Sequence, residues 1–125
     1  MLLQYAILSE TEVRYEEKIA DFIINFAKNH NLKWEQDAIG NVIVDIEATE
    51  DKKHSPCVIL QGHMDMVAVV ENGYEHDFLN APIEAYVDND KIRAKHTTLG
   101  ADNGIAIAMM LSLVKETNLS HGPLR

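Results

Sequence analysis

The chain has 125 residues, of which 46% are hydrophobic and 25% charged, and its formal net charge is −9. This length suffices for one small domain, and the composition is ordinary for a globular protein. The acidic balance argues against a nucleic-acid partner, because phosphates would be repelled, and no apolar run reaches the roughly 20 residues that a membrane helix needs. The single cysteine, Cys57, cannot form an internal disulfide and no signal peptide is visible, so we expect a cytoplasmic location.

The first half of the chain predicts one helix and a pair of strands. Hydrophobic residues recur at helical spacing over residues 15–27, which indicates an amphipathic helix ending near residue 30. Alternating patterns at 32–37 and 42–46 predict two strands joined by a short turn. The polar stretch 47–55 is typical of a surface loop.

The second half predicts a buried strand, a hairpin and a buried helix. Residues 57–60 form a short continuous apolar run, as in a strand covered on both faces of a parallel or mixed sheet. Hydrophobic and polar residues alternate across 83–95 on either side of a turn, which predicts a hairpin. Residues 105–114 are apolar nearly all round, so this helix should be buried. Residues 124–125 look like the start of another strand. The elements together predict an α/β fold with helices packed on a mixed sheet.

One candidate metal-binding pair follows the buried strand directly. His63 and Asp65 are two residues apart, so on an extended segment they project to the same side. They stand at the carboxyl end of the strand, where open α/β sheets place ligands. A histidine and a carboxylate suit zinc, either as ligands or as groups that support a ligand. The alternative is a strand-end histidine paired with a surface aspartate.

A second candidate residue, Asp102, stands between Gly100 and Gly104. Flanking glycines allow the backbone to approach a ligand closely. The same position opens the last helix, so an ordinary N-cap also explains the aspartate. The two roles are compatible if one carboxylate oxygen caps the helix while the other faces a metal. Two further histidines, His54 and His76, lie in polar loops and are predicted to be solvated.

Two motifs resemble those of the aminoacyl-histidine dipeptidases. They are QGHMDMV at 61–67 and TTLGADNG at 97–104, in the order and separation of that family. These enzymes, also called Xaa-His dipeptidases or peptidase D, belong to the M20 metallopeptidase superfamily. Shorter similar stretches lie at 15–17, 37–41, 76–78 and 121–124. The resemblance covers nearly the whole chain.

The resemblance implies a partial zinc-peptidase-like catalytic domain. Residues 1–125 would be the N-terminal part of one such domain, without the rest of it and without a lid or dimerisation domain. His63 matches the histidine that binds one metal, and Asp65 matches the catalytic-site aspartate that supports this histidine. Asp102 matches the aspartate that bridges two metals. The implied cofactor is two zinc ions, with cobalt or manganese as alternatives.

The rest of the family's site has no counterpart in this chain. A downstream Glu-Glu pair, a later aspartate and a late histidine complete the site in the family. Within the matched region, His96 stands where the family usually has glycine, and Ala106 replaces another usual glycine.

The implied activity of the complete enzyme is metal-dependent hydrolysis of the peptide bond of Xaa-His dipeptides. We expect the 125-residue chain alone to be inactive. One alternative is a family member that acts on tripeptides or acylated amino acids, and another is a non-catalytic truncated remnant. Self-association is also expected, because part of the helix at 105–114 would lack a covering layer.

Overall fold

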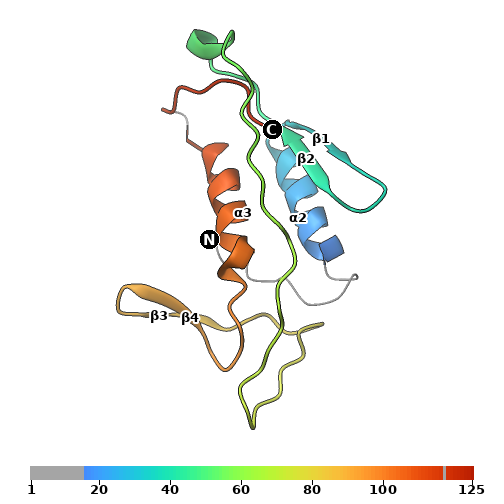
Figure 1. Ribbon diagram of the computed structural model, residues 1–125, viewed down its shortest axis with the longest axis vertical. Helices are drawn as coiled ribbons and strands as arrows, with labels where there is room; N and C mark the ends of the chain where they lie inside the picture. The colour runs from blue at the N-terminus through green and yellow to red at the C-terminus, as the bar shows by residue number, and fades with distance from the viewer. Residues whose placement is uncertain (1–15, 117) are drawn as a thin grey trace.

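The computed structural model describes residues 16–116 and 118–125. Helices α2 (Glu16–Asn29) and α3 (Ala101–Leu113) lie side by side and run in the same direction, both beginning near the middle of the molecule (Figure 1). Both helices were predicted from the sequence. No helix in the described ranges is long and apolar enough to cross a membrane.

Two hairpins flank these helices, as the alternating patterns predicted. Strands β1 (Lys33–Gln36) and β2 (Val42–Asp45) pair antiparallel and pack against α2. Strands β3 (Ala85–Asp88) and β4 (Lys91–Ala94) also pair antiparallel and lie beyond the beginning of α3 (Figure 1). A short 3-10 helix, η1 (Glu50–Lys52), lies in the predicted surface loop.

Helix α2 owes its position to an apolar face. Glu16 and Glu17 occupy its first turn and Lys28 its last, the arrangement that the helix dipole favours. At the end of the helix the His30 ring donates a hydrogen bond from Nδ1 to the carbonyl oxygen of Phe26, at 2.9 Å. The buried face consists of Ile19, Ala20, Ile24, Phe26 and Ala27.

The C-terminal residues join β2 to the segment that follows Pro56. Leu124 forms an antiparallel bridge with Ile46 on one side and a parallel bridge with Val58 on the other. The Leu60 amide then donates to the carbonyl oxygen of Arg125 at 2.8 Å. The α/β class is confirmed, but the predicted single mixed sheet is not formed in the described ranges: they hold two separate antiparallel pairs, and Leu124 adds isolated bridges, one of them parallel.

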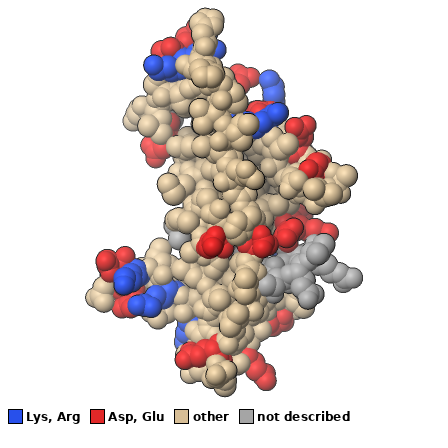
Figure 2. Space-filling view, in the orientation of Figure 1, with Lys and Arg blue, Asp and Glu red and all other residues tan. Residues whose placement is uncertain are grey.

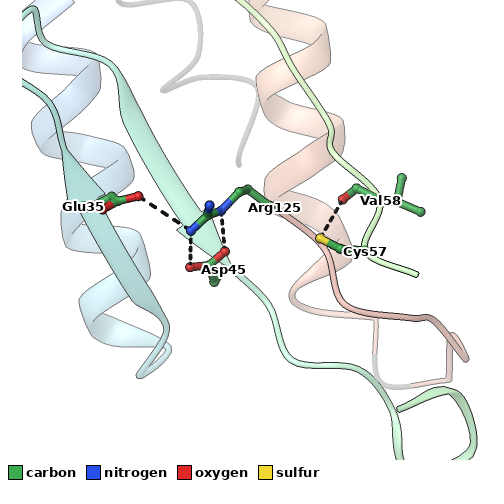
Figure 3. A network of polar contacts seen from close by, with 5 residues as sticks. All are labelled: Glu35, Asp45, Cys57, Val58 and Arg125. Carbon is green, nitrogen blue, oxygen red and sulfur yellow. Dashed lines mark hydrogen bonds and ion pairs between the residues drawn. The ribbon is translucent and has the colours of Figure 1, made fainter. Parts of the chain in front are cut away.

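A polar network reinforces this junction (Figure 3). The Arg125 guanidinium donates to both carboxylate oxygens of Asp45, at 2.8 and 3.1 Å, across 80 residues of sequence. Glu35 of β1 lies 3.6 Å from the same guanidinium. The hydrogen bond from Arg125 holds the pKa of Asp45 below its ordinary value. The network therefore ties the C-terminal residues to the first hairpin.

Helix α3 packs one face against α2. Its Ile107 and Leu111 form a core cluster with Ile19 and Phe26, and further apolar side chains surround this cluster. The prediction that the helix is buried holds for this face only, because Ile105 is 46% and Met109 64% exposed. In the described ranges no second layer covers that outer face.

The prediction of a strand buried on both faces at 57–60 is wrong. Val58 is 49% and Ile59 72% exposed, and Cys57 is exposed as well. The described chain supplies a backbone neighbour on one side of this segment, the C-terminal residues, and of its four side chains only Leu60 is partly buried. The backbone of this segment forms an isolated bridge at Val58 and no strand.

We predict that Leu111→Ala lowers the free energy of unfolding by about 2–4 kcal/mol, because it opens a cavity between α2 and α3. Urea denaturation of the purified chain measures this loss. Met109→Ala, on the exposed face of the same helix, is the matched control and should change stability by less than about 1 kcal/mol. Equal losses in the two variants would contradict the packing described.

We also predict that Asp45→Asn lowers the urea midpoint at neutral pH by removing the ion pair with Arg125. Because the folded pKa of Asp45 is lowered, its stabilising effect is present above the ordinary value of 3.8 and is lost as the pH falls through the folded value. The difference between the variant and the original chain should therefore vanish in acid. Asp88→Asn, which breaks an ion pair within one hairpin, is the control. A difference for Asp45→Asn that persists at the lowest pH would refute the electrostatic explanation.

Candidate metal-binding half-site

The extended segment after the sheet passes close to α3 at Gly62. A Cβ atom added at Gly62 would lie 3.3 Å from the Ala106 Cβ and 3.1 Å from the Met110 Cε. A side chain at position 62 would therefore push the segment away from the helix. The small residue at 62 allows the next residue, His63, to lie over the beginning of α3.

His63 is held from both ring nitrogens. Its Nε2 lies 3.1 Å from Asp102 Oδ1, and its Nδ1 lies 3.0 Å from Asp65 Oδ1. Nδ1 also donates to the main-chain oxygen of Asp65 at 3.1 Å. The structure thus brings together the three site residues that the sequence singled out. They come from two segments 39 residues apart.

Asp102 lies where the chain turns into α3. Gly100 adopts a φ of 73°, which favours glycine, and the Gly104 amide donates to its carbonyl oxygen at 3.0 Å. Asp102 has non-helical backbone angles, and the peptide bond to Asn103 is cis. The N-cap interpretation of Asp102 is wrong, because Gly100 is the N-cap and no side-chain cap hydrogen bond is formed. The Asp102 carboxylate instead faces His63.

The carboxylate of Asp102 favours a positive charge beside it, either on a protonated His63 or on a bound cation. The hydrogen bond to Asp102 raises the pKa of His63, and Asp65 adds a smaller effect in the same direction. Figure 2 shows acidic side chains in a band across the middle of the molecule, at the level where α2 and α3 begin. Acidic residues in the first turns of both helices, Glu16, Glu17 and Asp102, belong to this level. Such a concentration of negative charge attracts cations.

The donor set fits one part of a zinc site. Imidazole nitrogen and carboxylate oxygen are zinc ligands with metal distances of about 2.0–2.2 Å, so neighbouring donors of a tetrahedral ion lie about 3.3 Å apart. The 3.1 Å between His63 Nε2 and Asp102 Oδ1 is close to this spacing. Across residues 16–116 and 118–125, no three His, Cys, Asp or Glu side chains form a group that could hold a metal. The described chain therefore offers two donors for one ion.

The two departures from the family pattern occupy structurally demanding positions. His96 has a φ of 62°, a region that favours glycine. Its ring stacks on Tyr74 with centroids 3.5 Å apart, and its Nδ1 lies 2.8 Å from Glu71 Oε2. Ala106 makes the close contact with Gly62 described above. The sequence signal for this close approach is the small residue at each of the two positions.

The predictions for the loop histidines are mixed. His54 is exposed, as expected. His76 is not solvated, because its Nε2 is buried without a hydrogen-bond partner and its ring packs edge-on against Phe78 at 4.7 Å. Neither histidine lies among the contacts of His63.

Known proteins resemble this chain in sequence and in fold. No family model matches it. The cytosol non-specific dipeptidase of Escherichia coli (strain K12) is 40% identical over 110 residues, which are 88% of this chain and 23% of that protein. The crystal structure of aminoacylhistidine dipeptidase from Vibrio alginolyticus matches 98% of this chain and 25% of its own, with a TM-score of 0.91 and 33% identity.

More distant peptidases share the fold alone. Aminopeptidase PepT from Bacillus cereus and a tripeptidase from Staphylococcus aureus give TM-scores of 0.75 and 0.72, each at 21% identity and over 98% of this chain. The fold is thus that of a peptidase segment. The chain belongs to the family of the two dipeptidases, as its motifs predicted, and spans about a quarter of their length.

We predict that the metal-free chain has a His63 pKa above the ordinary value of 6.5 and that Asp102→Asn lowers it. A raised folded pKa means that the pair stabilises the chain below the ordinary pKa and that this effect is lost as the pH rises through the folded value. A histidine NMR titration measures the difference. The resonances of the exposed His54 should be the same in both proteins. A His63 pKa unchanged by Asp102→Asn would show that the contact is not formed in solution.

Proposed function

We propose that this chain supplies part of the active site of a metal-dependent dipeptidase, with His63 and Asp102 as zinc ligands. The approach of His63 Nε2 to Asp102 Oδ1, at 3.1 Å between distant segments, is the observation that carries the proposal. The names of the two relatives support the reaction class, since both are dipeptidases. We place the chain in the M20 superfamily on the motifs at 61–67 and 97–104.

The three side chains have distinct roles in this proposal. Asp65 holds Nδ1 of His63, so the ring presents Nε2 to a metal; such support fixes the ring orientation and tautomer. Asp102 has a side chain that is 95% exposed, so its carboxylate is accessible to a second ion as well. Binding at Nε2 requires His63 to give up the proton that it shares with Asp102, which makes affinity fall in acid.

When bound, a pair of zinc ions would supply a water molecule of lowered pKa and polarise the scissile carbonyl group. The chain's own contribution is to position two donors. A groove of about 890 Å³ lies beside the site, and its lining includes His63, Asp65 and the apolar Ile107 and Leu111. The general base and the remaining ligands, by resemblance a Glu-Glu pair, an aspartate and a histidine, lie outside this chain.

We propose dipeptides as the substrate class of the complete enzyme. The name of the Vibrio relative supports Xaa-His dipeptides, and the name of the Escherichia relative supports a broader set. The name of the Escherichia relative, a cytosol dipeptidase, also supports a cytoplasmic location.

A non-catalytic role is the second candidate. One observation favours it: among the described residues, two donors face each other where a catalytic zinc usually has three from protein.

We predict that the purified 125-residue chain does not hydrolyse dipeptides, because the general base and the other ligands are missing from it. The assay supplies zinc and an Xaa-His dipeptide and follows release of histidine. The Escherichia dipeptidase under the same conditions is the positive control. Metal-dependent turnover by the chain, abolished by His63→Ala, would overturn this prediction.

We further predict weak zinc binding by the metal-free chain, because two protein donors hold an ion less well than the usual three or four. Titration calorimetry should show no stoichiometric binding at about micromolar affinity or tighter. The weak binding that remains should decrease in His63→Ala and persist in His54→Ala. Stoichiometric binding at micromolar affinity or tighter, lost on His63→Ala, would contradict the two-donor description. Weak binding that His63→Ala leaves unchanged would count against the proposed function.

A further inference from the structure

The two segments that carry the site are joined by a short backbone ladder beyond it. Val70 and Thr97 form an antiparallel bridge, and the Thr98 amide donates to the carbonyl oxygen of Val69 at 3.0 Å. The Glu71 amide donates to the carbonyl oxygen of His96 at 2.8 Å. The ladder lies a few residues after His63–Asp65 on one segment and a few residues before Asp102 on the other, so it sets how the two approach.

The Thr98 hydroxyl bridges this ladder from the side. Its Oγ1 donates to the carbonyl oxygen of Val67 at 2.7 Å and accepts from the Val69 amide at 3.2 Å. One hydroxyl group therefore satisfies a donor and an acceptor of the opposite segment. The neighbouring Thr97 differs, because its Oγ1 is buried and has no hydrogen-bond partner.

The site needs such support because its own contacts are exposed. The side chains of His63 and Asp102 are 49% and 95% exposed. An ion pair so open to water contributes little to holding its partners in place. The alignment of the two donors must therefore come from the backbone segments that carry them.

We infer that Thr98 is a positioning residue, whose hydroxyl bridge to Val67 and Val69 holds His63 opposite Asp102. This inference rests on the proposed function for its consequence, since the aligned donors are the proposed zinc ligands. At the end of the ladder away from the site, the His96 ring stacks on Tyr74 and pairs with the Glu71 carboxylate. Groups that orient metal ligands typically change metal affinity by about 10–100-fold when removed.

Three substitutions separate this role from a general effect on folding. Thr98→Val removes the hydroxyl and keeps the shape, and Thr98→Ser retains the hydroxyl. Thr97→Val removes a hydroxyl without a partner at the adjacent position. Long-range proton–nitrogen NMR spectra of the His63 ring, at a pH where both ring nitrogens are protonated, report whether Nε2 is paired; Asp102→Asn gives the unpaired reference.

The expected result is that Thr98→Val shifts the His63 signal to the unpaired reference, while Thr98→Ser and Thr97→Val keep the signal of the original chain. A paired signal in Thr98→Val, or an equal loss in Thr97→Val, overturns the inference. An Asp102→Asn signal identical to that of the original chain also overturns it. If Thr98→Val does not fold, the original chain in low urea decides. The Val69 amide should then lose its hydrogen-exchange protection at the same urea concentration at which His63 loses its paired signal. Losses at different urea concentrations overturn the inference.

Cobalt(II) added to the same samples tests the proposed function separately. His63 resonances should shift or broaden in the original chain. The cobalt concentration that produces the same change should be about tenfold higher or more in Thr98→Val. No effect of millimolar cobalt on His63 would refute the metal role and leave the ring-pairing result to decide on Thr98. An unchanged cobalt requirement in Thr98→Val, with His63 responding, would refute the positioning role.

Discussion

The packing of α3 against α2 is the contact on which the candidate site depends. Ile107 and Leu111 hold α3 on the face of α2 through Ile19 and Phe26. The same helix carries Asp102 in its first turn and presents Ala106 to Gly62. Because hydrophobic packing fixes the helix, the position of its first residues is fixed as well, and the segment after the sheet can bring His63 to them.

Local patterns in the sequence predicted most of the fold. The apolar spacing of α2 and the alternation in both hairpins depend on neighbours within a few residues, and all three elements are present. The motifs also named His63, Asp65 and Asp102, which the structure brings together. This agreement has a physical basis, since a residue two positions along an extended segment projects to the same side.

Exposure was less predictable, because it depends on which segments meet in space. Ile59 belongs to an apolar run but is 72% exposed, and His76 lies in a polar stretch but has a buried ring nitrogen. The capping role of Asp102 was plausible from its position, yet a partner 39 residues earlier in the sequence takes its carboxylate. In the same way, the role of Thr98 rests on two hydrogen bonds to a segment about 30 residues away, which no local pattern encodes.

The central claim is that His63 and Asp102 are two donors to one metal ion. Its most direct test is anomalous X-ray scattering from crystals of this chain soaked in zinc. The account predicts a zinc peak within bonding distance of both His63 Nε2 and Asp102 Oδ1, absent from crystals of His63→Ala. A peak at another histidine, such as His54 or His121, with none between His63 and Asp102, would contradict it.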